Sequence, residues 1–162
     1  MDLQRRNLLR GKVGTPKQPI RLPWLTDADQ FSDGCTQCEK CITSCKENII
    51  VKGDGGFPEI NFTLGECTFC GACSNVCPEP LFIINNGQAP WDYHATVNNK
   101  CLTYNNISCQ SCQDSCEPMA IRFQYAIGKP PSPEINTESC TGCGACVATC
   151  PSQAIEIKSP TP

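Results

Sequence analysis

The chain has 162 residues, sixteen of them cysteine, and its formal net charge is −3. Only 40% of the residues are hydrophobic, so a conventional apolar core would be thin, and bonds to sulfur must replace part of it. No stretch approaches the roughly 18 apolar residues of a membrane span, so the composition argues against a transmembrane protein.

Residues 1–30 are predicted to form a basic N-terminal arm. Residues 1–21 hold six basic residues and one acidic residue, which leaves seven basic and fifteen acidic residues in the rest of the chain. The polar stretch after Arg5-Arg6 lacks the apolar part of an export signal, so we expect a cytoplasmic protein. Thiols stay reduced in that compartment, and clustered cysteines there indicate metal binding instead of disulfide bonds.

The sixteen cysteines fall into four runs of four, which form a duplicated pair. Cys109 repeats Cys38, and Cys140 repeats Cys67. We therefore predict module 1 at residues 31–86, a linker at 87–96, module 2 at 97–158 and a tail at 159–162. The runs are Cys35, Cys38, Cys41, Cys45; Cys67, Cys70, Cys73, Cys77; Cys101, Cys109, Cys112, Cys116; and Cys140, Cys143, Cys146, Cys150.

A strand, a turn and a second strand are predicted between the two runs of each module. In module 1, residues 49–51 lead through a glycine-rich turn to residues 57–62. In module 2, apolar and polar residues alternate over 121–125, a proline-rich stretch at 130–133 is expected to break the strand, and residues 134–136 return.

Each module is also expected to end in a short strand, at residues 81–84 and 154–157. The fold class that follows is α+β: tandem bacterial dicluster ferredoxin-like modules, with short β-hairpins and short helices around the metal sites. The apolar residues are expected to pack around those sites instead of forming an independent core.

Runs two and four are complete C-x2-C-x2-C-x3-C-P motifs, which are typical of bacterial ferredoxins. Three thiolates of a run wrap around one cubane, while the fourth, expected on the first turn of a helix, ligates the neighbouring cluster. Small residues such as Gly71 and Gly144 let the backbone approach the cluster closely. In run three, Cys101-x7-Cys109 replaces the first short gap, which predicts an inserted loop.

Crossed ligation assigns every cysteine to one of four [4Fe-4S] clusters and leaves none over. Four-cysteine zinc sites are the inorganic alternative, although two C-x2-C pairs with a long gap are their usual pattern. The predicted ligand sets are Cys35, Cys38, Cys41 with Cys77; Cys67, Cys70, Cys73 with Cys45; Cys101, Cys109, Cys112 with Cys150; and Cys140, Cys143, Cys146 with Cys116.

No substrate site is recognisable in the sequence, and we do not expect an enzyme. The sequence has no G-x-G-x-x-G after a strand, no P-loop and no sign of a catalytic triad around His94, its single histidine. His94 is expected on the surface or in the linker. Ordinary packing is the expected role of the aromatic residues Trp24, Phe69, Trp91 and Tyr104, and a position near the metal sites is the alternative.

Nearly the whole chain resembles the NapF-type ferredoxins of the periplasmic nitrate reductase system. The resemblance rests on Gln4-Arg5-Arg6-Asn7-Leu8-Leu9, on Arg21-Leu22-Pro23-Trp24, on the Cys101-x7-Cys109 gap and above all on the segment from Cys109 to Ile121, CQSCQDSCEPMAI. It implies a cytoplasmic accessory protein whose partner is the precursor of the nitrate reductase catalytic subunit. Such a protein would assemble or reduce the [4Fe-4S] cluster of that subunit before export.

The second interpretation is an electron-transfer protein that takes electrons from a redox donor and relays them to a membrane or redox enzyme partner. Neither interpretation involves nucleic acid or a transmembrane segment. A stable complex with the precursor would favour the accessory role. Cluster potentials between those of donor and acceptor would favour the relay.

The charge distribution leads to a prediction for the arm, because residues 1–21 have a net charge of +5 against −8 for the remainder. We predict that Arg5, Arg6 and Arg10, with Leu8 and Leu9, dock on the catalytic subunit or its export machinery; a solvated tail is the alternative. Arg5→Ala/Arg6→Ala should keep the iron content but capture less precursor in a cytoplasmic pull-down. The loss should be larger at low salt, where exposed charges are less screened. Unchanged capture would indicate a solvated tail.

Overall fold

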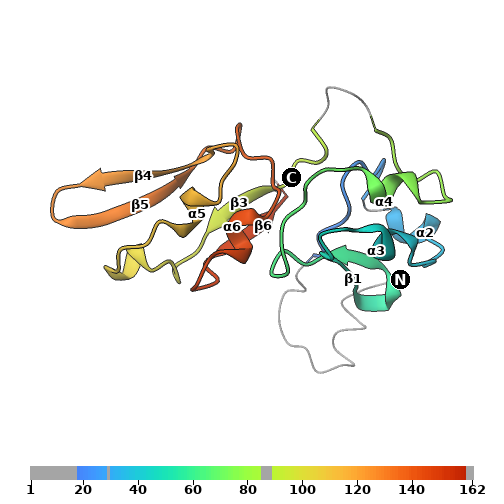
Figure 1. Cartoon of the computed structure of the whole chain (residues 1–162), viewed down its shortest axis with the longest axis horizontal. Helices are drawn as coiled ribbons and strands as arrows, with labels where there is room; N and C mark the ends of the chain where they lie inside the picture. The colour runs from blue at the N-terminus through green and yellow to red at the C-terminus, as the bar shows by residue number, and fades with distance from the viewer. Residues whose placement is uncertain (1–17, 29, 85–88, 160–162) are drawn as a thin grey trace.

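The computed structural model describes residues 18–28, 30–84 and 89–159, which form two bodies side by side, one for each predicted module (Figure 1). The predicted docking residues Arg5, Arg6, Leu8, Leu9 and Arg10 lie outside the described residues. All helices and strands within the described ranges are short, and the predicted α+β class is confirmed. None of the helices in these ranges is long and apolar enough to cross a bilayer.

The elements follow one another in the order that the repeat predicts, with a hairpin between the runs of each module. They are α2 (Phe31–Gly34), α3 (Lys40–Ser44), β1 (Ile50–Lys52), η1 (Asp54–Gly56), β2 (Pro58–Ile60), α4 (Ala72–Asn75), β3 (His94–Val97), η2 (Thr103–Asn105), α5 (Ser111–Asp114), β4 (Ile121–Ala126), β5 (Lys129–Ile135), α6 (Ala145–Ala148) and β6 (Ile155–Lys158).

The hairpin predicted in module 1 is confirmed. Strand β1 pairs antiparallel with β2, and Ile50 lies opposite Ile60. Gly55 has a φ of 76° in the turn between them, a conformation that a side chain would strain. Ile50, Ile60 and Phe62 are buried. The face of the hairpin that carries the apolar residues of the alternating pattern therefore lies toward the core.

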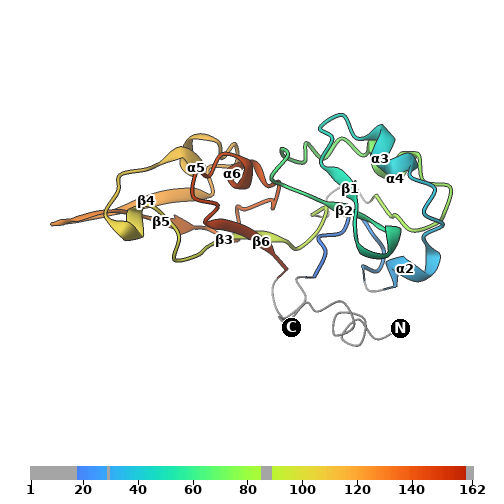
Figure 2. The ribbon, with the colours of Figure 1, turned by 90° about the horizontal axis from the view of Figure 1, so that it is seen from below.

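The hairpin of module 2 is longer and projects away from module 1 (Figure 2). Strand β5 extends from Lys129 to Ile135, with Pro133 opposite Phe123, so the expected break at residues 130–133 does not end the strand. It corresponds instead to a shift of register, because Gln124 pairs with Ser132 but Ala126 pairs with Lys129. Both strands of a two-stranded sheet are edge strands, where proline is tolerated because its missing N–H can face away from the partner strand. The prolines also make this edge a poor template for further strand pairing.

A third two-stranded sheet joins the beginning of module 2 to its end. Strand β3 pairs antiparallel with β6, and Ala95 lies opposite Ile157. The strand expected at residues 154–157 is confirmed as β6, shifted by one residue. Strand β3 begins at His94, inside the segment predicted as linker, so this segment contributes to the sheet of module 2.

The end of the predicted arm packs on module 1. The amide of Ile60, at the end of β2, donates a hydrogen bond of 2.8 Å to the carbonyl oxygen of Ile20, on the edge of β2 that faces away from β1. Leu22 and Pro23 are buried. This contact extends module 1 on its N-terminal side beyond the first run of cysteines.

The strand expected at residues 81–84 is wrong. Phe82 forms only an isolated antiparallel bridge with Leu25. Trp24 has a φ of 61°, which is far from extended backbone, so the segment opposite residues 81–84 cannot continue as a strand. Two flanking hydrogen bonds, from Thr26 to Leu81 and from Ile83 to Trp24, complete this short contact.

Cysteine side chains form part of the core, as the composition predicts. Cys73, Cys112 and Cys146 are buried in one continuous apolar cluster that includes residues of both modules. The aliphatic and aromatic members of that cluster are Leu22, Ile49, Ile50, Ile60, Phe62, Ala95, Ile121, Phe123, Ile155 and Ile157.

Candidate metal centres

Four cavities among the described residues are each lined by four cysteines, three from one run and the fourth from the other run of the same module. Their free volumes, including space open to solvent, are about 310 to 440 Å³, so the four sites are similar in size. The sets are Cys35, Cys38, Cys41, Cys77; Cys45, Cys67, Cys70, Cys73; Cys101, Cys109, Cys112, Cys150; and Cys116, Cys140, Cys143, Cys146. The structure thus brings together the same thiols that crossed ligation groups.

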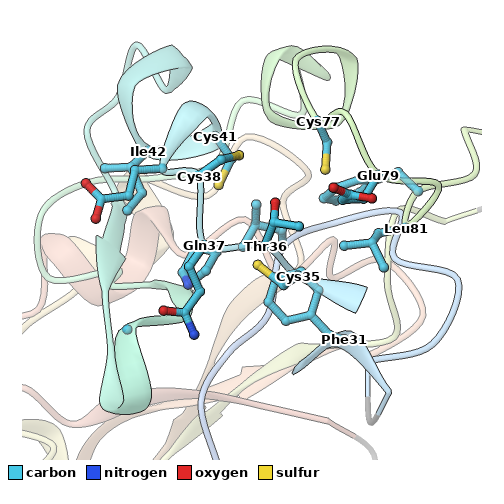
Figure 3. A pocket seen from close by; sticks show the side chains of 15 residues that line it. Phe31, Cys35, Thr36, Gln37, Cys38, Cys41, Ile42, Cys77, Glu79 and Leu81 are labelled. Atoms are coloured by element: carbon cyan, nitrogen blue, oxygen red, sulfur yellow. The ribbon is translucent and has the colours of Figure 1, made fainter. Parts of the chain in front are cut away.

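Figure 3 shows the first cavity, where Cys35, Cys38 and Cys41 surround a space that Cys77 enters from another segment. Cys41 lies on α3, whereas Cys77 lies two residues beyond the end of α4. The fourth cysteine therefore follows the helix, and the expectation that it lies on the first turn is wrong. Gly71, with a φ of 72°, caps α4 directly after the second cysteine of its run, so the third cysteine occupies the first turn.

The loops before these helices share a backbone pattern. In runs one, two and four, the residues on both sides of the second cysteine have positive φ: Gln37 and Glu39, Phe69 and Gly71, and Gly142 and Gly144. Left-handed residues in such loops help to turn N–H groups into one concavity, as in other Fe–S sites. Run three departs from the pattern, because Gln110 has a φ of −137° and its inserted loop contains η2.

Backbone amides of module 2 donate hydrogen bonds to cysteine sulfurs, three of them at 3.2 to 3.4 Å. Such bonds stabilise negative charge on sulfur and are one of the factors that set the potential of an Fe–S site. For Cys150, burial raises the pKa, but hydrogen bonds from Ala154, Ser152 and Ile155 lower it, and the net shift is downward. The bonds run from Ala95 to Cys140 Sγ at 3.4 Å, from Ala120 to Cys116 Sγ at 3.3 Å, and from Ala154 to Cys150 Sγ at 3.2 Å.

Burial makes an uncompensated thiolate unfavourable in these cavities. Desolvation raises the pKa of Cys73 and Cys146 to about 12, and it raises the pKa of Cys41, Cys67 and Cys112 to about 11. Thiolates at these positions need positive charge beside them, which metal ions supply. An all-sulfur donor set is the chemistry of Fe–S clusters and of zinc.

The arrangement of the thiols suits a cluster better than a single ion. Four thiolates around one zinc ion would lie roughly 3.8 Å apart, because the Zn–S bond is about 2.3 Å long. The thiols of each set are instead spread around the wall of a cavity. In the described ranges, no three His, Cys, Asp or Glu side chains converge closely enough to hold a single metal ion.

The other residues singled out in the sequence fall into two groups. Trp24 and Phe69 line the second cavity, beside Cys67 and Cys70, and so they pack against that set. Tyr104 lies in the inserted loop of run three and is 47% exposed, and His94 is half-buried in β3.

The sequence did not identify Arg21 as a residue near a metal site. Its guanidinium lies 5.2 Å from the centre of the Phe31 ring and donates a hydrogen bond of 3.1 Å to the carbonyl oxygen of Pro58. Burial lowers the pKa of Arg21, while attraction to Glu59 and to Cys35 of the first set opposes that shift. The segment Arg21-Leu22-Pro23-Trp24 contributes to the family resemblance, but nothing in it indicates that Arg21 lies beside a cysteine set.

Comparison with known families identifies the class of the protein. The 4Fe-4S dicluster domain family matches the chain twice, at residues 34–80 and 107–154, which together include more than half of the chain. The matches contain every cysteine except Cys101, which the long gap of run three separates from Cys109. Fold, cavities and family agree on a tandem dicluster ferredoxin.

Individual relatives narrow this class. The ferredoxin-type protein NapF of Escherichia coli strain K12 is 44% identical over 155 residues, and that of Haemophilus influenzae is 44% identical over 166 residues; each alignment covers 96% of this chain and 94% of the relative. A component of the ion-translocating oxidoreductase complex of Methanosarcina acetivorans is 32% identical over 136 residues, which cover 77% of this chain and 47% of that protein. The chain belongs to the family of NapF ferredoxin-type proteins.

The crossed sets lead to a prediction for module 1. We predict that Cys45→Ser and Cys67→Ser damage the same metal site and that Cys77→Ser damages the other one, because Cys45 and Cys67 line one cavity and Cys77 lines its neighbour. EPR and Mössbauer spectra of the three variants, read with their iron contents, check this. If the Cys45 variant resembled Cys35→Ser instead, the crossed assignment would be wrong.

Proposed function

We propose that the chain holds four [4Fe-4S] clusters and serves as a cytoplasmic accessory protein of a periplasmic nitrate reductase, acting on its catalytic subunit before export. The proposed action is to assemble or to reduce the [4Fe-4S] cluster of that subunit, and we do not assign an enzymatic activity to the chain. One observation supports it above the others: four cavities of four thiols occur in a chain that is 44% identical over nearly its whole length to NapF ferredoxin-type proteins.

The residues of each cavity fit the proposed clusters. Four cysteine ligands close each site, and the raised pKa values of Cys73 and Cys146 mean that the protein alone does not stabilise these two thiolates. When bound, a [4Fe-4S] cluster supplies reversible one-electron transfer. The sixteen cysteines are proposed as the iron ligands, three of each site from one run and one from the other.

The charge of the chain supports a protein partner for the arm. Residues beyond 21 have a net charge of −8, and each oxidised cluster with its four thiolates adds roughly −2. The basic arm and the strongly acidic remainder of the chain therefore have opposite net charges. Opposite charges on one chain allow it to bind a partner that combines acidic and basic surfaces, as a large enzyme precursor can.

An electron relay is the second candidate function, and the exposure of two cysteines favours it. Cys38 and Cys70 are exposed, so the first and second sites both reach the surface, where an external donor or acceptor can exchange electrons with them. A relay requires site potentials between those of donor and acceptor, whereas an accessory protein requires a lasting complex with the precursor.

The two functions can be separated by capture under anaerobic conditions. The loaded chain, immobilised and exposed to cytoplasmic extract, should retain the precursor of the catalytic subunit if the accessory role is correct. The mature subunit, with its own cluster in place, is the control and should be retained less. Equal failure to retain both forms, together with rapid reoxidation by an acceptor, would support the relay instead.

The cluster content gives a direct prediction. After anaerobic purification, the chain should contain about sixteen iron atoms and sixteen acid-labile sulfides, because four sites close with four thiolates each. Iron, sulfide and zinc analysis on the same sample measures this. Near-stoichiometric zinc without labile sulfide would refute the cluster assignment.

Removal of iron should unfold both modules. Helices of four or five residues are not stable alone, and the core contains cysteines where an ordinary domain would have aliphatic residues. We therefore expect a chelator to abolish the cooperative thermal transition seen by circular dichroism. A cooperative transition that persists in iron-free protein would show that the apolar core suffices.

A further inference from the structure

The loops of the second and fourth runs are joined by a direct hydrogen bond between the two modules. The amide of Cys67 donates to the carbonyl oxygen of Cys143 at 2.8 Å. Cys67 belongs to the second cysteine set and Cys143 to the fourth, so the bond connects the walls of two cavities.

Aromatic side chains hold this junction from one side. Trp91 packs edge-on against Phe69 of the second run at 5.5 Å between ring centres, and against Phe62 at 6.1 Å. The same indole donates a hydrogen bond of 2.8 Å to the carbonyl oxygen of Thr141 in the fourth run. Trp91 therefore bridges the two loops whose backbones meet at Cys67 and Cys143.

The junction also depends on glycine. Gly144 follows the second cysteine of run four, and a methyl group there would lie 2.0 Å from a ring carbon of Phe62, which belongs to module 1 and is buried. Gly71 occupies the equivalent position in run two with a similar φ, and a methyl group there would meet nothing closer than 3.6 Å. The close approach of the modules is thus the feature that excludes a side chain at Gly144.

Within each module, the two cavities meet through the third cysteines of the runs. Cys41 lies on α3 and Cys73 lies on α4, two helices that pack against each other, and these two thiols belong to neighbouring sets. In module 2, α5 with Cys112 packs against α6 with Cys146 in the same way. Both views place α6 between α5 and module 1 (Figures 1 and 2).

We propose that the four sites form one row, in the order of the Cys35, Cys67, Cys140 and Cys101 sets, and that the Cys67–Cys143 junction is the step through which electrons pass between modules. The proposal rests on the cluster content proposed above. One electron from a low-potential one-electron donor reduces the site that it enters. Each transfer then oxidises the site that gives the electron and reduces its neighbour by the same single electron, until a one-electron acceptor takes it from the row.

In this row, the Cys140 and Cys67 sets occupy the inner positions, and the Cys35 and Cys101 sets are the ends. Cys38 gives the first end direct access to solvent, whereas no cysteine of the Cys101 set, at the other end, is exposed. Cys70 of the inner Cys67 set is exposed as well, so that site can also exchange electrons at the surface. Trp91, Phe62 and Gly144 act as positioning residues, because they fix the two loops without supplying a thiol.

The test compares full-length Gly144→Ala with Gly71→Ala, which imposes similar backbone strain at the equivalent position, and with Gly128→Ala, whose methyl group would meet nothing within 4 Å. Trp91→Leu removes the contacts of Trp91 with Phe69, Phe62 and Thr141 without altering a cysteine loop. This variant therefore still tests the junction if Gly144→Ala does not fold. Each anaerobically purified protein is measured for iron and sulfide, for spin coupling by EPR after full reduction with dithionite, and for maximum dimension by small-angle X-ray scattering.

We expect Gly144→Ala and Trp91→Leu to lose the part of the spin coupling that links the modules and to increase in maximum dimension. Gly71→Ala should match the unaltered chain in maximum dimension, because a methyl group there meets only residues of module 1, and Gly128→Ala should match it in both respects. If the spin coupling is unchanged in Gly144→Ala and Trp91→Leu at full iron content, the proposed order of the four sites is wrong, even if the maximum dimension increases. A shortage of iron in the unaltered chain would instead refute the proposed cluster content, and scattering would still test the junction.

Discussion

At each metal site, sulfur atoms from two separate runs of the chain must meet, and the rest of the structure depends on that requirement. The fourth cysteine of each run lines the cavity of the other run, so the two halves of a module are tied together twice. Helices of four or five residues and strands of three to seven residues would not persist alone. They hold their places because they position thiols, and metal bound by these thiols would link segments as a disulfide does.

The spacing of the cysteines was sufficient to predict which four thiols share a cavity, because a short gap fixes the reach of each loop. It was not sufficient for details that depend on neighbouring segments. The prolines of β5 are tolerated because the strand pairs on one side only, which is a property of the sheet. Likewise, residues 81–84 fail to form a strand because Trp24 bends the segment opposite them. In all four runs the helix begins two residues after the second cysteine and ends before the fourth, in run three without a left-handed residue at its start.

The relation between the modules had no signal in the sequence. The hydrogen bond from Cys67 to Cys143 uses backbone atoms, and Trp91, Phe62 and Gly144 belong to no motif that marks an interface. The departures from the repeat lie elsewhere in module 2, in the loop before Cys109 and in the long hairpin, where Tyr125 and Ile127 are highly exposed. The repeated parts of the chain therefore form the interior of the molecule, and the parts that differ lie at its outer end.

Diffraction from anaerobically grown crystals, recorded on both sides of the iron absorption edge, tests the central claim most directly, because anomalous differences locate iron without reference to the chain. The account predicts four separate groups of iron, each within one crossed set of cysteines. Two groups should lie in module 1 and two in module 2, with the junction between Cys67 and Cys143 separating the pairs. Iron groups bound by the four cysteines of a single run, or anomalous signal at the zinc edge in their place, would contradict it.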